Sequence, residues 1–298
     1  MALNFPTPKF YRLFELNEAA GTVYHAGDAL TVTTMAQGSF GGEFLSGTLQ
    51  PGGGRWEEPT GDAIRVDNKY ILKTFDDAVI LMNTSGWRHA DGEQVRVQFQ
   101  TGAKKYAWLN QTIAVGRSEI SRGFPILAVY AMLPACAPAP KGQPAALECE
   151  ELYYVEVTVG EQMKSGPFEG GQLMIIPITG GSFKGERMNG IVEAFGADYN
   201  VLNQGMPVRS HITTRYMLTT DDGAHISLTT DGRLLMDLKG VKAMMKDEPD
   251  YVEKAYFRQH LIFTTGDERY CRLNRSICFA VIAMGKDQTV RYKAYCLK

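Results

Sequence analysis

The chain contains two copies of one sequence pattern, and this internal repeat constrains the fold more than any single motif does. The segment Gly38–Gly47 (GSFGGEFLSG) aligns with Gly181–Gly190 (GSFKGERMNG) at an offset of 143 residues (181 − 38), and six of the ten positions are identical. Two further blocks follow in the same order: residues 70–86 align with 216–232 at an offset of 146, and residues 99–113 with 263–277 at an offset of 164. Three collinear blocks indicate a tandem duplication of one domain.

A proline-rich segment separates the two copies. Residues 134–151 (PACAPAPKGQPAALECEE) contain four prolines, and this spacing favours an extended connector over a helix. We therefore predict a first repeat over 1–133, a connector over 134–151 and a second repeat over 152–298, each close to an ordinary domain size. We also predict an approximate two-fold relation between the repeats, as in a duplicated homodimer.

Both copies have the pattern of β-strands. Short β-branched or aromatic runs such as LTVTTM, AVILMN, YYVEVTV and ICFAVIAM alternate with glycine and Asp-Gly turn signals. The pattern predicts an all-β protein built from two tandem homologous β-barrel-like domains. Gly42 and Gly185 recur where strands must bend or approach closely, and Pro51–Gly54 (PGGG) reads as a turn.

The second copy contains an insertion. The offset between the copies steps from 146 to 164, which places eighteen extra residues (164 − 146) between Gly232 and Phe263. The sequence there has helical character on both sides of Pro249. We predict a short helical insertion over 233–262 in the second repeat. It is either a surface decoration or a lid over a cavity.

Composition and charge exclude several classes of partner. The 298 residues carry a net charge of −2 without a basic block, so we expect neither nucleic acid nor an anionic membrane as a partner. The N-terminus lacks a secretory pattern, and the five cysteines include no CxxC motif. Reduced thiols and a cytoplasmic location are therefore expected. Whether the chain forms a homo-oligomer stays open.

Standard catalytic and cofactor motifs do not occur in the sequence. It contains no HExxH, GxSxG or Walker motif and no GxGxxG opening a helix, and none of its five histidines recurs in both copies. We therefore expect no metal site and no cofactor.

One face of a predicted strand keeps its residues in both copies. The pattern Tyr-x-Leu-x-Thr-x-Asp runs from Tyr70 to Asp76 and from Tyr216 to Asp222, whereas the intervening residues diverge. Because side chains alternate along a strand, the kept residues share one face. The first interpretation is a cavity wall with Tyr70, Asp76, Tyr216 and Asp222 as catalytic residues. The second is that each Thr-x-Asp caps a turn.

Other recurring positions suggest contacts rather than proton transfer. We assign Trp56 and Trp108 to substrate binding, because aromatic faces stack on apolar ligands, and we add Arg215 as a third substrate contact. Asn110 and Asn274 occupy equivalent positions in the third block. For these two we favour buried amides that tie strands together.

These residues carry a resemblance to a known family. The run G-x-F-x-G-x-x-x-x-G, then PGGG-x-W, D-x-[RK]-Y-x-L-x-T-x-D and W-L-N, resembles a bacterial and fungal family long filed as a domain of unknown function. The first copy matches at residues 40, 42, 47, 51–54, 56, 67, 69, 70, 74, 76 and 108–110. The second copy departs at the PGGG segment, at Thr213 in place of Asp and at Arg272 in place of Trp.

The resemblance implies an activity. Tandem fungal members of this family include a polyketide-pathway cyclase of phenalenone biosynthesis, which adds a phenol to the alkene of a reverse-prenyl group and forms a dihydrobenzofuran. For this chain the resemblance implies a cofactor-independent cyclase acting on a small aromatic prenylated substrate. The alternative is a non-catalytic β-barrel that binds an apolar aromatic metabolite. A proton donor facing the cavity would separate the two.

Overall fold

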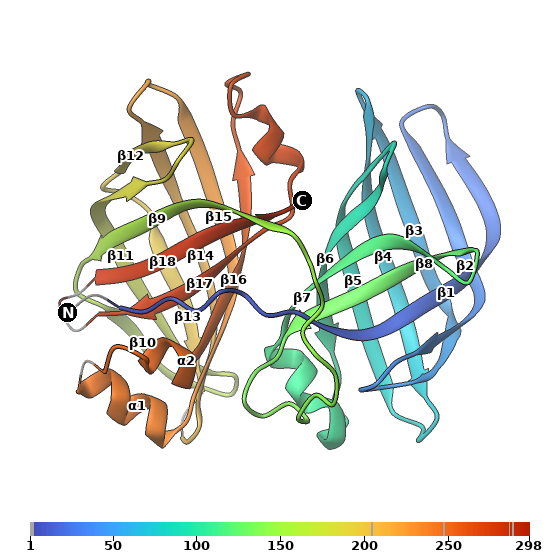
Figure 1. Cartoon of the computed structure of the whole chain (residues 1–298), viewed down its shortest axis with the longest axis horizontal. Helices are drawn as coiled ribbons and strands as arrows, with labels where there is room; N and C mark the ends of the chain where they lie inside the picture. Colours follow the sequence, from blue (N-terminus) through green and yellow to red (C-terminus); the bar gives the residue numbers. More distant parts are fainter. Residues whose placement is uncertain (1–2, 204, 247, 286, 288) are drawn as a thin grey trace. The chain divides into compact units, whose positions relative to one another are not determined.

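The computed structural model describes residues 3–203, 205–246, 248–285, 287 and 289–298 (Figure 1). The chain divides into two compact units. One comprises Lys9–Ala146, and the other comprises Leu147–Lys298 together with Met1–Pro8. None of the helices in the described ranges is long and apolar enough to cross a membrane.

The first unit is a closed antiparallel barrel. Each strand pairs with the next one, and β8 pairs with β1. On β6, Val95, Val97 and Phe99 are buried and the residues between them are more exposed, so the period-two pattern places one face in the barrel core. A 3₁₀-helix, η1 (Lys104–Gln111), precedes β7. The strands are β1 (Tyr11–Ala26), β2 (Leu30–Gly41), β3 (Gly47–Thr60), β4 (Ala63–Thr74), β5 (Val79–His89), β6 (Gly92–Gln100), β7 (Ile113–Ser121) and β8 (Phe124–Met132).

The second unit closes in the same way. The order β11-β12-β14-β15-β16-β17-β18-β9 is antiparallel throughout, and β11 pairs with β9 to complete the ring. Strand β10 extends from β11, and β13 lies between β11 and β14. The strands are β9 (Cys149–Val159), β10 (Met163–Phe168), β11 (Gly171–Lys184), β12 (Asn189–Val192), β13 (Ala197–Leu202), β14 (Val208–Thr220), β15 (His225–Met236), β16 (Tyr256–Thr264), β17 (Cys278–Met284) and β18 (Thr289–Leu297); η2 (Cys271–Arg275) precedes β17.

The registers of the two barrels are equivalent. Met82 pairs with Phe99 between β5 and β6, and Leu228 pairs with Phe263 between β15 and β16, which are the positions that the sequence repeat aligns. The predicted fold class, two tandem homologous β-barrels, is confirmed. The two-fold relation between the repeats stays a prediction.

Two glycines that recur in both copies lie where two strands approach each other closely. A Cβ atom on Gly42 would lie 2.1 Å from the Leu13 carbonyl oxygen, and one on Gly185 would lie 2.0 Å from the Leu152 carbonyl oxygen. No side chain fits at these distances, so the backbone crossing requires glycine.

The PGGG segment is not a turn between strands, contrary to the sequence-based expectation. Pro51–Gly54 lies inside β3, where the register with β4 shifts between Gln50 and Gly54. The segment is therefore a β-bulge. A Cβ on Gly53 would lie 2.3 Å from the Lys69 carbonyl oxygen, which explains why small residues are needed there.

The predicted insertion over 233–262 contains two short helices. They are α1 (Leu238–Met245) and α2 (Tyr251–Lys254), at the end of the barrel where β15 stops and β16 begins (Figure 1). Asp237 caps α1 by accepting a hydrogen bond of 2.8 Å from the Gly240 amide. The two ends of the interval are strands, because the ladder pairing continues there: β15 extends to Met236 and β16 begins at Tyr256.

The proline-rich connector leads directly into the second barrel. Within 134–151, the Ala145 amide donates a hydrogen bond of 2.7 Å to the Phe10 carbonyl, and β9 begins at Cys149. The division between the compact units falls after Ala146. The domain bounds 1–133 and 152–298 remain sequence-based predictions.

Candidate active site in the second barrel

Asp76 lies at the turn that follows β4, outside the barrel core. Thr74 Oγ1 and Tyr106 Oη donate hydrogen bonds of 2.5 and 2.9 Å to Asp76 Oδ1, and Lys105 Nζ lies 2.5 Å from Oδ2. These partners, Lys105 first, hold the pKa of Asp76 well below its ordinary value. The carboxyl group therefore ties the turn to η1 as an ionised group.

Asp222 makes the same arrangement in the second copy. Thr220 Oγ1 and Tyr270 Oη donate hydrogen bonds to its carboxylate, and Arg269 Nη1 lies 2.9 Å from Oδ2. The Thr220 hydrogen bond is the main cause of the lowered pKa of Asp222. The side chains of Asp76 and Asp222 are 44% and 46% exposed. These contacts favour the turn-cap interpretation of the repeated Thr-x-Asp pattern.

Tyr70 lies inside the first barrel beside a buried ion network. Arg55 forms ion pairs with Glu18 and Glu93, the latter with an Nη2–Oε2 distance of 2.8 Å, and a longer contact of 3.4 Å with Glu57. Burial, followed by the charge of Glu18, raises the pKa of Tyr70 well above its ordinary value. The carboxylates here are thus compensated by a guanidinium.

Tyr216 lies inside the second barrel in a cluster of three tyrosines. Its hydroxyl is hydrogen-bonded to that of Tyr292, which in turn lies 3.3 Å from the hydroxyl of Tyr153. Burial is the main cause that raises the pKa of Tyr216 and Tyr153 well above the ordinary range and that of Tyr292 to about 12. All three hydroxyl groups therefore stay protonated at neutral pH.

Asp198 is the unusual carboxyl group of this interior. It lies on β13 opposite Thr214, whose Oγ1 donates a hydrogen bond of 2.5 Å to Asp198 Oδ1. Burial raises the pKa of Asp198 to about 6, and only the Thr214 hydrogen bond acts in the opposite direction. Among the described residues no cation pairs with it. A carboxyl group in this state exchanges a proton near neutral pH.

Asp198 and two of the tyrosines line one internal cavity. Its volume is about 20 Å³, enough for one small group, and its wall is otherwise mostly apolar. Polar groups in the wall come from Asp198, Thr214, Tyr216, Gln259 and Tyr292; the apolar lining is Val157, Val159, Ile178, Phe257, Ile282 and Val290.

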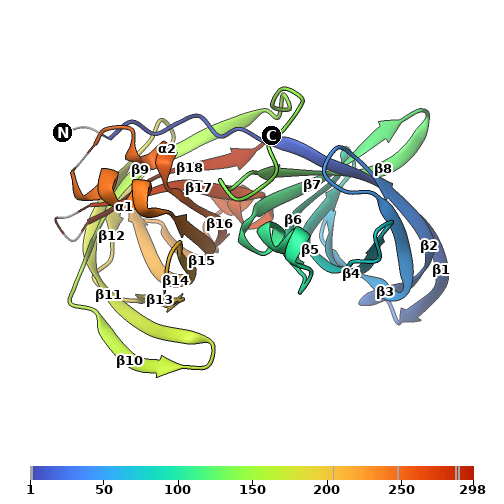
Figure 2. The ribbon, with the colours of Figure 1, turned by 90° about the horizontal axis from the view of Figure 1, so that it is seen from below.

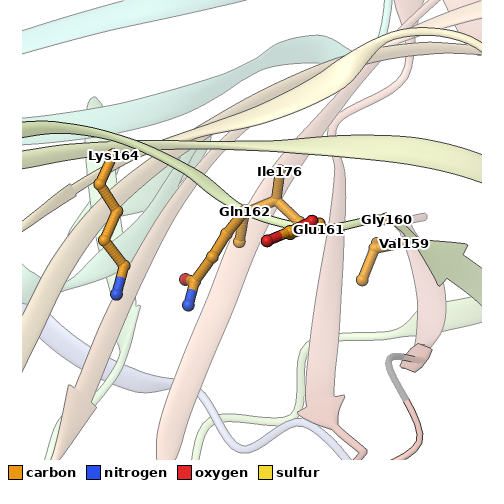
Figure 3. A pocket seen from close by; sticks show the side chains of 6 residues that line it. All are labelled: Val159, Gly160, Glu161, Gln162, Lys164 and Ile176. Carbon is orange, nitrogen blue, oxygen red and sulfur yellow. The ribbon is translucent and has the colours of Figure 1, made fainter.

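A larger hollow opens beside this cavity. It has a volume of about 560 Å³ and is lined by Val159, Gly160, Glu161, Gln162, Lys164 and Ile176 (Figure 3). Val159 lines both spaces. The hollow forms where β9 ends and β10 begins, and the β10–β11 hairpin projects away from the rest of its barrel (Figure 2). In the first barrel, β1 runs through the equivalent position without a break.

The two barrels differ at the position of Asp198. The repeat offset of 146 aligns Asn68 with Thr214, and their cross-strand partners are Arg55 and Asp198. Arg55 in the first barrel is therefore replaced by Asp198 in the second. The offset of 164 likewise aligns Glu93 with the apolar Phe257. The first barrel holds a compensated ion network where the second holds a solitary carboxyl group.

None of the three predicted substrate contacts lines this cavity. Trp56 is partly buried on β3 with Lys69 Nζ 5.9 Å from its ring centroid. Trp108 is buried in η1 and packs on Phe44 at a centroid distance of 5.9 Å. Arg215 is exposed on β14, between the inward-facing Thr214 and Tyr216. Of the seven predicted site residues, Tyr216 alone lines the Asp198 cavity.

Sequence reasoning missed Asp198, Thr214, Tyr292 and Gln259. A signal for Asp198 is present in the sequence. Because Trp56 aligns with Tyr199, Arg55 aligns with Asp198, and the charge at this inward-facing position changes from positive to negative. Tyr292 and Gln259 have no counterpart of the same residue type in the first copy. A comparison that selects residues shared by both copies therefore does not select them.

The two recurring asparagines have a structural role, but they are half-buried and do not join two strands as we expected. The Thr101 amide donates to Asn110 Oδ1 and Asn110 Nδ2 donates to the Thr101 carbonyl, both at 2.9 Å. Asn274 makes the same pair of bonds to Thr265, at 2.9 and 2.8 Å. Both amides fasten a 3₁₀-helix to the strand before it.

Comparison with known proteins identifies the family. Residues 8–97 and 147–297 match the family described as "Protein of unknown function (DUF3237)". A UPF0311 protein of Rhodopseudomonas palustris is 28% identical over 144 residues, 48% of this chain and 93% of that protein. A protein of Penicillium herquei named "Hydroalkoxylation enzyme phnH" is 31% identical over 116 residues, 37% of this chain and 75% of that protein.

Solved structures give matches of the same extent. A β-barrel-like protein of Acinetobacter baumannii is 28% identical, with a TM-score of 0.44 over 53% of this chain and 100% of that one. An enzyme of Penicillium herquei is also 28% identical, with a TM-score of 0.37 over 44% of this chain and 98% of that one. Because the family model covers most of the sequence in two segments, one in each barrel, this chain is a tandem member of the DUF3237 family.

Proposed function

We propose that this protein is a cyclase that adds a phenol hydroxyl to an alkene within one small prenylated aromatic substrate, with Asp198 as the group that transfers the proton. The observation that carries the proposal is the solitary carboxyl group in an apolar, tyrosine-lined cavity, with a pKa raised to about 6. Similarity to a protein named as a hydroalkoxylation enzyme supports the reaction type.

The reaction needs one proton donated and one removed. In the proposed mechanism, protonated Asp198 delivers its proton to the terminal alkene carbon, and the phenol oxygen bonds to the internal alkene carbon. The Asp198 carboxylate then accepts the phenol proton, which regenerates the acid. The product is an isomer of the substrate, so the balance is complete without oxidant or reductant.

The surroundings of Asp198 suit this chemistry. Burial in the apolar wall raises the pKa of Asp198 to about 6, so about a tenth of the carboxyl groups carry a proton at pH 7, far more than an ordinary aspartate would. Tyr216 and Tyr292 line the same cavity, and aromatic faces stabilise developing positive charge on carbon. Folding of the phenol onto the alkene in a confined space would supply much of the rate.

In this proposal the substrate occupies both the inner cavity and the outer hollow. The inner cavity of about 20 Å³ is too small for an aromatic ring system. The outer hollow of about 560 Å³ falls within the range of small-molecule sites. We propose that the ring system occupies the hollow and that the prenyl group reaches past Val159 toward Asp198.

The test compares two aspartates that differ only in environment. A reverse-prenylated phenalenone-type phenol is incubated with wild-type protein, with Asp198→Asn and with Asp222→Asn, and the cyclic ether is quantified. We expect Asp198→Asn to lose about 10²–10⁴-fold in turnover and Asp222→Asn to remain near the wild-type rate. Tight binding of the phenol without any turnover by the wild type would instead support the non-catalytic binding barrel.

A further inference from the structure

Two cysteines face each other across neighbouring strands inside the second barrel. Cys278 on β17 is the direct cross-strand partner of Cys296 on β18. Ile282 and Tyr292 lie an even number of positions away on the same two strands and line the Asp198 cavity. Because side chains alternate along a strand, both thiols therefore point into the barrel. Their side chains are buried, with 0% and 4% of the residue surface exposed.

This pairing meets the geometric requirement of a disulfide bond. Directly opposed residues of antiparallel strands have Cα atoms about 4.5 or about 5.5 Å apart, and disulfides join Cα atoms at separations of roughly 4.4–6.8 Å. A hydrogen bond from Cys278 to Cys296 brings the two sulfur atoms together. A disulfide between these residues is therefore compatible with the ladder as it stands.

The first barrel has no sulfur at the matched pair. At the repeat offset of 164, Cys278 aligns with Ala114, whose cross-strand partner on β8 is Ala131. Both alanines are fully buried, so the barrel scaffold closes at this point without a thiol. The cysteine pair is therefore a property of the barrel that holds Asp198 rather than of the fold.

Cys296 is the reactive member of the pair. A hydrogen bond from Cys278 is the main cause that lowers the pKa of Cys296 to about 7. A hydrogen bond from Ser276 and the charge of Arg272 act in the same direction, against burial and the charge of Glu150. About half of the Cys296 population is thiolate at pH 7, and the thiolate is the nucleophilic form. Arg272 is half-exposed in η2, so this end of the barrel faces solvent.

The other cysteines are poorer partners for Cys296. Cys149 on β9 lies opposite Leu297, the residue after Cys296, so strand alternation directs its side chain to the other face of the sheet. Burial is the main cause that raises the pKa of Cys149 to about 11, and its thiol stays protonated at neutral pH. Cys136 and Cys271 are exposed.

We infer that Cys278 and Cys296 are a redox site, which hydrogen peroxide oxidises to an intramolecular disulfide. The Cys296 thiolate attacks one peroxide oxygen; the S–O bond forms as the O–O bond breaks, and the released hydroxide takes up a proton as water. Cys278 then loses its proton and attacks the Cys296 sulfur; the S–S bond forms as the S–O bond breaks, and a second water leaves. The two sulfurs lose two electrons, which reduce the peroxide. The inference is independent of the proposed cyclase reaction.

The test maps disulfides in the native full chain. Reduced protein at pH 7, without denaturant, is treated with equimolar hydrogen peroxide, and the remaining thiols are blocked with N-ethylmaleimide. Intact protein and unreduced tryptic peptides are then analysed by mass spectrometry. We expect a protein that has lost two hydrogen atoms and a cross-linked peptide that joins residues 276–286 to residues 294–298. Dithiothreitol should restore the original mass.

The variants assign the cross-link to this pair. Cys278→Ala and Cys296→Ala introduce the residue type of the first barrel, and each should lose the cross-linked peptide, whereas Cys149→Ala should keep it. A second readout is the melting temperature. It should be higher for the oxidised wild type than for the reduced one, because the cross-link restricts the unfolded chain. Peroxide should leave the melting temperature of Cys278→Ala unchanged.

Three results would overturn the redox site. The first is a native wild type without the cross-linked peptide, including one that forms it only after unfolding in urea. The second is a peptide that joins Cys296 to Cys149 instead of Cys278. The third is Cys296 recovered only as sulfinic acid, because the neighbouring thiol would then have failed to capture the sulfenic acid.

Discussion

Thr214 Oγ1 donates a hydrogen bond of 2.5 Å to Asp198 Oδ1, and within the described part of the second barrel this is the one interaction that opposes the effect of burial on the carboxyl group. Burial disfavours the charged form and raises the pKa, whereas the hydroxyl stabilises the carboxylate. The pair therefore sets the pH range over which Asp198 exchanges its proton.

Loss of the Thr214 hydroxyl should move this range upward. In Thr214→Val the carboxylate loses its donor, so we expect the pKa of Asp198 to rise above about 6. The pH profile of turnover should shift to higher pH by the same amount. Thr220→Val, which removes the equivalent donor to the exposed Asp222, is the control and should leave the profile in place. An unshifted profile in Thr214→Val would contradict the assignment.

Turnover should depend on the protonated form of Asp198. Because the pKa of Asp198 is about 6, kcat/KM should be constant below pH 6. Above pH 6 it should fall about tenfold per pH unit, because the protonated form of Asp198 is depleted. The measurement is kcat/KM from pH 4.5 to 8.5. A rate that instead rises with pH through 6 would assign Asp198 to the role of base.

Asp198 should destabilise the fold at neutral pH. The pKa of Asp198 is about 6 in the folded state, above the ordinary value of 3.8, so the folded state binds the proton more tightly than the unfolded state does. The free energy of unfolding therefore falls as the pH rises from about 4 to 6. The shift corresponds to a loss of at most about 3 kcal/mol above pH 6. Asp198→Asn should therefore be more stable than the wild type at pH 7 and nearly equal to it at pH 4, by urea unfolding. A less stable variant at pH 7 would contradict this account.

The turn aspartates should affect stability and leave activity intact. The folded pKa values of Asp76 and Asp222 lie below the ordinary value. The two carboxylates therefore stabilise the fold at pH values above the ordinary pKa of an aspartate. This stabilisation is lost as the pH falls through their lower pKa values in the folded state. We expect Asp76→Asn and Asp222→Asn to lower the melting temperature modestly at pH 7, with a smaller difference near pH 2. A large loss of turnover in Asp222→Asn would return this residue to the catalytic site.

The fold could be predicted because its determinants recur along the chain. The repeated glycines such as Gly42 and Gly185, the alternating strands and the Asn110–Asn274 correspondence all encode local backbone requirements. The PGGG segment was misread because a bulge and a turn need the same residues, and only ladder pairing distinguishes them.

The candidate site was harder to predict for the same reason. Residues shared by both copies report the common scaffold, so Asp76 and Asp222 recur as parts of equivalent turns. Asp198 and Tyr292 differ between the copies, and their proximity depends on the closure of the barrel, which brings β18 and β13 to one cavity. A charge reversal at an inward position, Arg55 to Asp198, is a better signal of a specialised copy.

The central claim is that Asp198 delivers the proton to the substrate, and deuterium labelling tests it most directly. The reverse-prenylated phenol is converted in D₂O by wild-type protein, Asp198→Asn and Asp222→Asn, and the ether is analysed by NMR. For the wild type and Asp222→Asn we predict rapid incorporation of one deuterium into the methyl group formed from the terminal alkene carbon. Asp198→Asn should form this product about 10²–10⁴-fold more slowly. Equal rates of labelled product from Asp198→Asn and the wild type would contradict the account.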